Sequence, residues 1–130
     1  MTMTDNPVAN PETKTHALIA SDRVEGTVVR RPNGDKVGSI ERLMIDKLSG
    51  KVAYAVLSFG GFLGMGEKHL PIPWERMKYD PAIGAYAIDI SDDELAKAPS
   101  YAADGDFDWG DRSQERQLHD FYQARPYWGI

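Results

Sequence analysis

The sequence predicts a small, mainly β protein: an antiparallel barrel of about six short strands, followed by short C-terminal helices. Short β-prone runs alternate along the chain with tight turns that contain Gly, Pro, Asn and Asp, a pattern typical of such barrels. The 130 residues are 42% hydrophobic and 27% charged, as in an ordinary globular domain with one core. After Ile90 the hydrophobic period changes from that of a strand to that of a helix.

The first predicted hairpin joins residues 26–31 to residues 36–46. Both runs are β-prone, and the turn between them, Pro32-Asn33-Gly34-Asp35, combines a proline with an Asn-Gly pair that favours positive φ. The apolar positions of the second run leave strict alternation once. This slip indicates a β-bulge or a bend.

The next predicted strand, Lys51–Phe59, is apolar at both alternating sets of positions, so we expect it to be covered on both faces. A glycine-rich loop, Gly60–Gly66, separates it from the run at residues 68–73. Pro71 and Pro73 cannot donate ladder hydrogen bonds, which indicates an edge position or a strand end.

Residues 74–77 are expected to form a single helical turn before the last β run, residues 85–90. In that run Tyr86, Ile88 and Ile90 lie on one face. About six short strands joined by short turns predict a closed or nearly closed sheet, because closure removes exposed edges.

Two helices are predicted in the C-terminal part. Ser91 and Glu94 have the spacing of a capping box, so a short helix begins there and ends before Pro99. Residues 113–124 form the second helix. Its apolar face carries Leu118, Phe121 and Tyr122.

The chain divides into three parts. Residues 1–17 are polar, with few large apolar side chains, and are predicted to be disordered. Residues 18–90 are the β domain, and residues 91–130 are an acidic loop with a helical extension. The N-terminus lacks the pattern of a signal peptide, and no apolar run is long enough to span a bilayer as a helix. We therefore expect a cytoplasmic protein without membrane insertion.

The charge pattern argues against nucleic acid as a partner. The formal net charge is -5, and the Lys and Arg residues are scattered instead of forming a basic stripe. The chain contains no cysteine, which excludes disulfide and thiolate chemistry.

No catalytic, cofactor or metal site is predicted, so we expect a protein that is not an enzyme. The loop Gly60–Gly66 lacks the Lys-Ser/Thr pair and the following helix that a phosphate-binding loop needs. His16, His69 and His119 are far apart in the sequence and have no zinc-ligand spacing. No serine has the surroundings of a nucleophile elbow.

The acidic residues 104–115 leave one alternative open. Counted from Asp104, carboxylates fall at positions 1, 3 and 5, and Glu115 falls at position 12, as in a calcium-binding loop. Position 6, where the loop must turn sharply, is Trp109. A solvated acidic loop is favoured, and weak binding of a divalent cation is the alternative.

The sequence from Ala20 to Ile90 resembles the PRC-barrel domain. The segments that carry the resemblance are Gly26–Val29, Gly38–Asp46, Gly50–Lys68 and Leu70–Trp74. The tail is similar to that of stand-alone bacterial PRC-barrel proteins at Ala98–Tyr101, Asp108–Trp109 and Pro126–Trp128. This family is named for the cytoplasmic part of the photosynthetic reaction-centre H subunit, and it also occurs in ribosome-maturation factors. The resemblance implies a six-stranded barrel-like adaptor or assembly module with no known catalytic apparatus.

The resulting hypothesis is a non-catalytic module that forms homo-oligomers and binds an unidentified protein partner. Large apolar residues on the glycine-rich loop either fold onto the barrel end or contact a partner, and both remain open. The predicted partner contacts are Phe62, Leu63, Met65, Trp74, Tyr122, Tyr127 and Trp128. The alternative is a small-ligand or metal-sensing domain that uses the barrel mouth or the acidic loop at residues 104–115.

Overall fold

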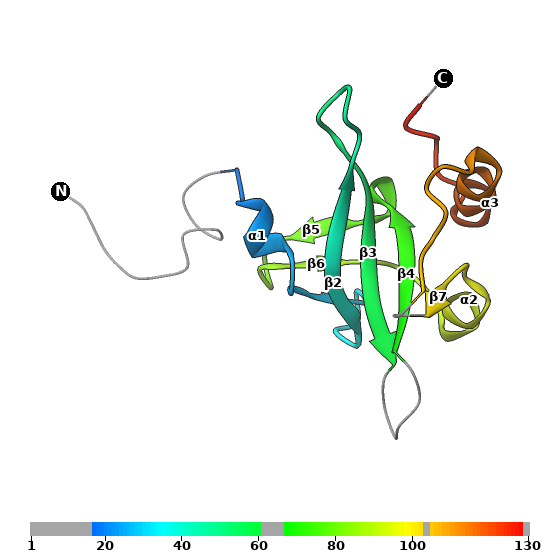
Figure 1. Ribbon diagram of the computed structural model, residues 1–130. Helices are drawn as coiled ribbons and strands as arrows, with labels where there is room; N and C mark the ends of the chain where they lie inside the picture. The colour runs from blue at the N-terminus through cyan, green and yellow to red at the C-terminus, as the bar shows by residue number, and fades with distance from the viewer. Residues whose placement is uncertain (1–16, 61–66, 103–104, 129–130) are drawn as a thin grey trace.

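A seven-stranded sheet forms the centre of the computed structural model, which describes residues 17–60, 67–102 and 105–128 (Figure 1). Its strands are β1 (Val28–Arg30), β2 (Lys36–Ile45), β3 (Val52–Gly60), β4 (Glu67–Pro73), β5 (Lys78–Asp80), β6 (Ala85–Ala87) and β7 (Tyr101–Ala102). The α-helices are α1 (Ser21–Val24), α2 (Asp92–Lys97) and α3 (Arg112–Tyr122), and a 3-10 turn, η2 (Trp74–Arg76), follows β4.

The strand order is β5-β6-β1-β2-β3-β4-β7, and the sheet is open. The mainly β class is therefore confirmed, and seven strands are close to the predicted number of about six, but the described strands do not form a closed antiparallel barrel. One neighbouring pair, β1 with β6, is parallel. The sheet does not close because β5 lies at one edge, while the outer side of β4 is occupied by β7 and by α3.

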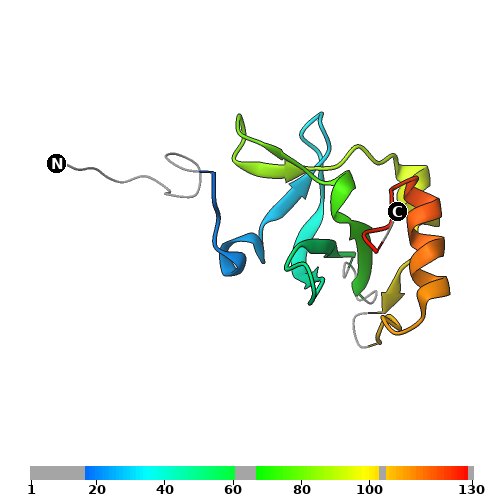
Figure 2. The same ribbon diagram turned by 90° about the horizontal axis from the view of Figure 1, so that it is seen from above.

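Curvature gives the open sheet part of the shape of a barrel. The strands β2, β3 and β4 run side by side, and β5 and β6 cross them at a steep angle (Figure 1). Seen from above, α3 covers one flank of the sheet and α1 lies at the other (Figure 2). The helical extension therefore covers the side where a further strand would close a barrel.

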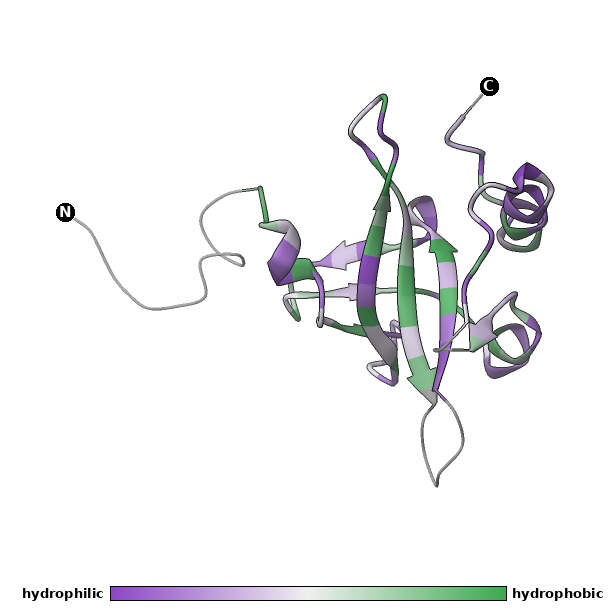
Figure 3. Ribbon diagram, viewed as in Figure 1, coloured by the Kyte–Doolittle hydropathy of each residue, from purple (hydrophilic) through white to green (hydrophobic). Residues whose placement is uncertain are grey.

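The central strand β3 is buried on both faces, as its sequence predicts. Tyr54, Ala55, Val56 and Leu57 are all almost fully inaccessible to solvent. Figure 3 shows mostly hydrophobic residues along β3, whereas β2 changes to strongly hydrophilic residues part of the way along. The core is thus built around β3 and the facing parts of β4, β6 and α3.

The irregularity predicted in the second run is present in β2. Its register against β3 shifts between Ile40 and Arg42 and again between Met44 and Ile45. Each shift bends the strand and increases its local twist.

The helices of the extension begin at side-chain caps. The hydroxyl of Ser91 accepts a hydrogen bond from the Glu94 N–H (3.1 Å), and the Glu94 carboxylate accepts one from the Ser91 N–H (3.0 Å), so the predicted capping box of α2 is confirmed. Asp111 caps α3, which ends at Gln123 in the left-handed conformation (φ 54°, ψ 41°). Within the described ranges, no helix has the length and apolar character needed to cross a membrane.

Candidate functional site

The described residues predicted to contact a partner lie in η2, in α3 and in the segment that follows α3. Phe62, Leu63 and Met65 lie outside the described residues. The residues beside them, Gly60 and Glu67, pair across β3 and β4 at the end of the hairpin far from the β2–β3 turn.

Trp74, Tyr127 and Trp128 lie near the other end, where β3 begins and β4 ends. Trp74 follows Pro73, which pairs with Tyr54 close to the start of β3. The rings of Tyr127 and Trp128 contact each other, with centroids 5.1 Å apart. The remaining predicted residue of the set, Tyr122, is 2% exposed and packs inside its own chain.

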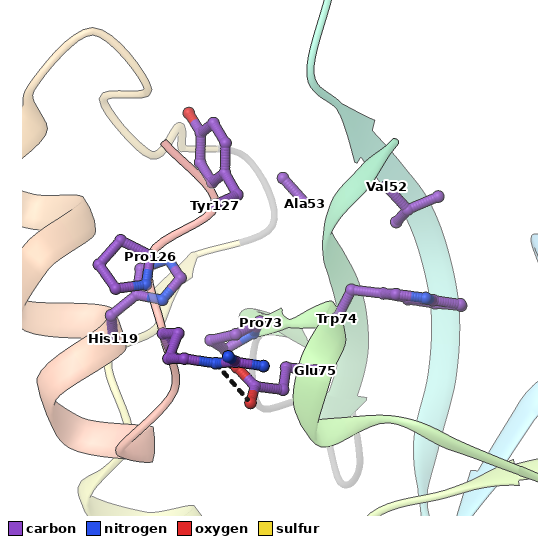
Figure 4. Close-up of a pocket in the computed structure, with 9 residues that line it drawn as sticks. Val52, Ala53, Pro73, Trp74, Glu75, His119, Pro126 and Tyr127 are labelled. Atoms are coloured by element: carbon purple, nitrogen blue, oxygen red, sulfur yellow. Dashed lines mark hydrogen bonds and ion pairs between the residues drawn. The ribbon is translucent and has the colours of Figure 1, made fainter. Parts of the chain in front are cut away.

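A cleft of about 540 Å³ separates the C-terminal segment, residues 124–128, from the start of β3. Figure 4 shows His119, Pro126 and Tyr127 on one side of this cleft, with Val52 and Trp74 on the other. The lining residues are Val52, Ala53, Pro73, Trp74, Glu75, His119, Arg125, Pro126 and Tyr127. Most of this lining is apolar or aromatic.

The 3-10 turn η2 holds the C-terminal segment through two charged side chains. One oxygen of Glu75 accepts a hydrogen bond from the backbone N–H of Arg125 (2.9 Å), and the other lies 3.6 Å from the Arg125 Nε. Arg76 donates to the carbonyls of Tyr122 and Asp89, both at 2.9 Å. Hydrogen bonds to charged groups are among the stronger ones, so η2 fixes both the end of α3 and the start of the segment.

Beneath the segment lies a buried polar cluster formed by Tyr54 of β3 with Glu115 and His119 of α3, which we call the Tyr54 cluster. The Tyr54 hydroxyl is 2.7 Å from Glu115 Oε1 and 2.8 Å from His119 Nε2. His119 Nδ1 is 3.2 Å from the carbonyl oxygen of Ala124. A carbonyl oxygen only accepts, so Nδ1 carries the proton in this contact. The cluster joins β3, α3 and the C-terminal segment.

Burial determines the protonation of the cluster. It raises the pKa of Tyr54 strongly, and hydrogen bonding to Glu115 raises it further, so the hydroxyl keeps its proton. Burial lowers the pKa of His119, although the Ala124 carbonyl and the carboxylates of Glu115 and Glu75 act in the opposite direction. His119 is therefore neutral at neutral pH, with Nε2 as an acceptor. The Tyr54 hydroxyl is a hydrogen-bond donor between two acceptors, and a protonated phenol of raised pKa is a poor nucleophile.

Arg112, in the first turn of α3, holds the aromatic end of the C-terminal segment. Its guanidinium carbon lies 4.1 Å from the centre of the Trp128 ring and 5.7 Å from that of Tyr127. The Arg112 Nη1 is also 3.7 Å from Glu115 Oε2. Stacking of a guanidinium on aromatic rings is favourable and is strengthened by partial burial.

Exposed apolar side chains gather at this same end of the sheet. Leu48 in the β2–β3 turn is 98% exposed, and Ile45 at the end of β2 is 53% exposed. A second cavity of about 360 Å³ is lined by Ile45 and Tyr127 together. Tyr127, itself 40% exposed, lines both cavities and therefore lies between them.

The carboxylates of the acidic loop are engaged locally. Asp104 lies outside the described residues, Asp108 accepts a hydrogen bond from the Gly110 N–H (3.0 Å), and Asp111 accepts one from the Ser113 N–H (2.9 Å). Among the described residues, no group of three or more His, Asp or Glu side chains is arranged to hold a metal ion. Asp108 and Asp111 therefore act as turn and cap acceptors.

His69 is also buried, but it does not belong to the Tyr54 cluster. Its ring packs edge-on against Tyr101, with centroids 5.3 Å apart. Its Nδ1 has no hydrogen-bond partner among the described residues. His16 lies outside those residues.

Sequence reasoning missed the Tyr54 cluster, although one signal was present. Glu115 and His119 are spaced i, i+4 and are buried with Leu118 and Tyr122, two residues of the predicted apolar face. A charged residue on an apolar helix face indicates a buried partner. The partner itself could not be predicted, because Tyr54 is distant in the sequence and reaches α3 only through the fold.

Comparison with protein families identifies the family of the chain. A family model described as the PRC-barrel domain matches residues 18–95, which is more than half of the chain. No curated protein matches the sequence.

Proposed function

This chain belongs to the PRC-barrel domain family, and we propose that it is a non-catalytic adaptor module that self-associates and binds a protein partner. The surface proposed for self-association is the end of the sheet that carries the β2–β3 turn and the C-terminal segment.

The observation that supports this surface is the exposure of Leu48. It is a large aliphatic side chain at a turn, almost wholly in water, and Ile45 and Tyr127 lie exposed at the same end. Exposed apolar groups that cluster are characteristic of interaction surfaces. Burying one leucine side chain contributes roughly 1.5–3 kcal/mol. In a two-fold symmetric dimer each such contact occurs twice.

Sedimentation velocity across a concentration series tests self-association. We expect the wild-type chain to form dimers as concentration rises, and Leu48→Asp to remain monomeric because the charge cannot be buried without a partner. Ile83→Asp is the matched control, because Ile83 is also an exposed aliphatic residue (51%) in a turn, between β5 and β6.

Equal dimerisation of Leu48→Asp and wild type would reject this surface. A wild-type chain that stays monomeric at every concentration would reject self-association altogether.

Phe62, Leu63 and Met65 remain the predicted contacts for a different protein. Gly60 and Glu67, the described residues on either side of them, pair at the end of the sheet opposite the Leu48 surface. Replacing all three by serine is expected to leave the dimer intact and to abolish binding of the partner, once that partner is known.

A ligand-binding role is the second candidate, because the cleft has a volume of about 540 Å³. Small-molecule sites commonly measure 300–1,000 Å³ and are lined mostly by apolar and aromatic residues. A thermal-shift screen of metabolites distinguishes this role, since a specific ligand raises Tm with its concentration. A ligand effect that disappears in Tyr127→Ala but persists in Ile83→Asp would support it.

A further inference from the structure

We infer that two copies of this chain exchange their C-terminal segments, so that Arg125 and Tyr127 of one copy line the cleft of the other. This inference rests on the proposed self-association and names the contact through which it occurs. Three features of the structure carry it: the contacts of the segment, the conformation of the residue that joins it to α3, and the apolar surface beside it.

The segment is bound to its own chain by contacts that another copy can provide equally well. Glu75 binds the Arg125 backbone and side chain, and His119 Nδ1 binds the Ala124 carbonyl. Because an exchanged segment makes the same contacts in the partner's cleft, their free energy cancels between monomer and dimer. The equilibrium between monomer and exchanged dimer therefore depends on three other quantities. These are the backbone strain at the residue that joins α3 to the segment, the new contacts between the copies, and the entropy lost on association.

The joining residue favours exchange. The chain turns back from α3 onto the cleft at Gln123, the one non-glycine residue with positive φ among those that the structure describes. The left-handed conformation is unfavourable for residues with a Cβ, and helices that end this way usually have glycine at the position. If Gln123 adopts helical angles instead, this strain is released, and the segment leaves its own cleft.

The new contacts also favour exchange. Exchange brings the clefts of two copies together, and Leu48 and Ile45 lie exposed at the same end of each sheet. Burial of these side chains between the copies is an additional interaction that the monomer lacks. The release of strain at Gln123 and the burial of Leu48 and Ile45 both stabilise the exchanged dimer, whereas the entropy lost on association destabilises it.

Substitutions at Gln123 change the backbone strain at this residue and leave the apolar contacts between the two copies unchanged. Gln123→Gly removes the strain of the left-handed conformation, so we expect its dimer to be on the order of tenfold weaker than that of wild type. Gln123→Ala retains the strain and favours the helix, so we expect its dimer to be as tight as that of wild type or tighter. Sedimentation velocity measures both, and circular dichroism confirms that each variant is folded.

Cross-linking shows whose cleft the segment occupies. The chain has no cysteine, so the single variants Glu75→Cys and Arg125→Cys each carry one reactive thiol. When they are mixed and treated with a short bis-maleimide, exchange predicts covalent dimers that contain one chain of each kind. Such dimers are expected in larger amount when both chains also carry Gln123→Ala than when both carry Gln123→Gly.

The outcomes separate this inference from the proposed function. If the protein dimerises but a Glu75→Cys/Arg125→Cys double variant is cross-linked only within single chains, exchange is wrong and self-association stands. Equal dimer affinity of Gln123→Gly and Gln123→Ala would also contradict exchange. A wild-type chain that stays monomeric at every concentration would reject exchange and self-association together.

Discussion

The hydroxyl group of Tyr54 joins the sheet to α3 through two buried hydrogen-bond contacts. Its proton lies between two buried acceptors, Glu115 Oε1 and His119 Nε2. Tyr54→Phe removes that proton and leaves both acceptors without it. We expect a loss of about 1–3 kcal/mol in the free energy of unfolding, measured by urea denaturation.

Tyr122→Phe is the matched control, because the Tyr122 hydroxyl is buried without a hydrogen-bond partner among the described residues. Burial also raises the pKa of Tyr122, so this hydroxyl stays protonated and polar. Its removal is expected to leave stability unchanged or to increase it. A loss as large as that of Tyr54→Phe would show that the two hydroxyl groups are equivalent and would contradict the cluster.

His119 makes stability depend on pH in a defined window. Burial holds its pKa in the folded protein below the ordinary value of 6.5, so between these two values the unfolded chain binds the proton and the folded chain does not. The stability is complete above pH 6.5 and falls as pH drops from 6.5 towards the folded-state pKa. The slope from this one proton is at most about 1.4 kcal/mol per pH unit.

Urea denaturation of wild type and His119→Gln between pH 7.5 and 5 measures this effect, because glutamine does not titrate. Wild type should lose more stability over this range than the variant, and equal losses would contradict a buried, neutral His119. Asp46 and Asp111 do not interfere, since hydrogen bonds to Ser49 and Ser113 lower their pKa values below 3.8. Their stabilisation is lost only in more acidic solution.

At the scale of elements, the pairing of β2 with β3 depends on the absence of a side chain at Gly38. A Cβ at this position would lie 2.5 Å from the Ser58 carbonyl oxygen, a backbone atom that cannot move without displacing β3. We expect Gly38→Ala to destabilise the fold by about 1–3 kcal/mol. Chemical denaturation measures the change.

Gly105→Ala is the control, because a Cβ there would have its nearest contact at 3.4 Å, an ordinary distance. Its effect is expected to stay within about 0.5 kcal/mol. Similar losses in the two variants would mean that Gly38 is required for some reason other than space.

Elements with strong local signals could be predicted from the sequence. The apolar run of β3 indicated burial on both faces, and Ser91 and Glu94 indicated the start of α2, because capping depends on residues three positions apart. The face of α3 was predicted through Leu118 and Tyr122. The roles of Glu115 and His119 on that face were not, since they depend on a strand that local spacing does not identify.

At the scale of the whole molecule, the sequence pattern could not predict whether the sheet is open or closed. Short strands and tight turns predict that edges must be protected, but they do not say whether closure or helices protect them. Here β7 pairs with part of β4, and α3 covers the same side. The helical extension takes the place of the predicted closure, so an open sheet satisfies the same requirement.

The two ends of the β3–β4 hairpin give the molecule a shape that suits the proposed adaptor. The end with the β2–β3 turn carries Leu48 and the cleft, whereas Gly60 and Glu67 mark the end that leads into the predicted partner loop. Self-association at one end leaves the other accessible.

The parallel pairing of β1 with β6 affects how the protein is made. Val29 and Arg30 pair with Tyr86 and Ala87, so β2, β3 and β4 are all synthesised between the two partners. The hairpins β2–β3 and β3–β4 use only near neighbours and can form early, but β1 lacks one of its partners until β6 leaves the ribosome. During that interval its unpaired edge is available to other nascent chains. Among the described strands, β1 therefore waits longest for one of its partners during synthesis.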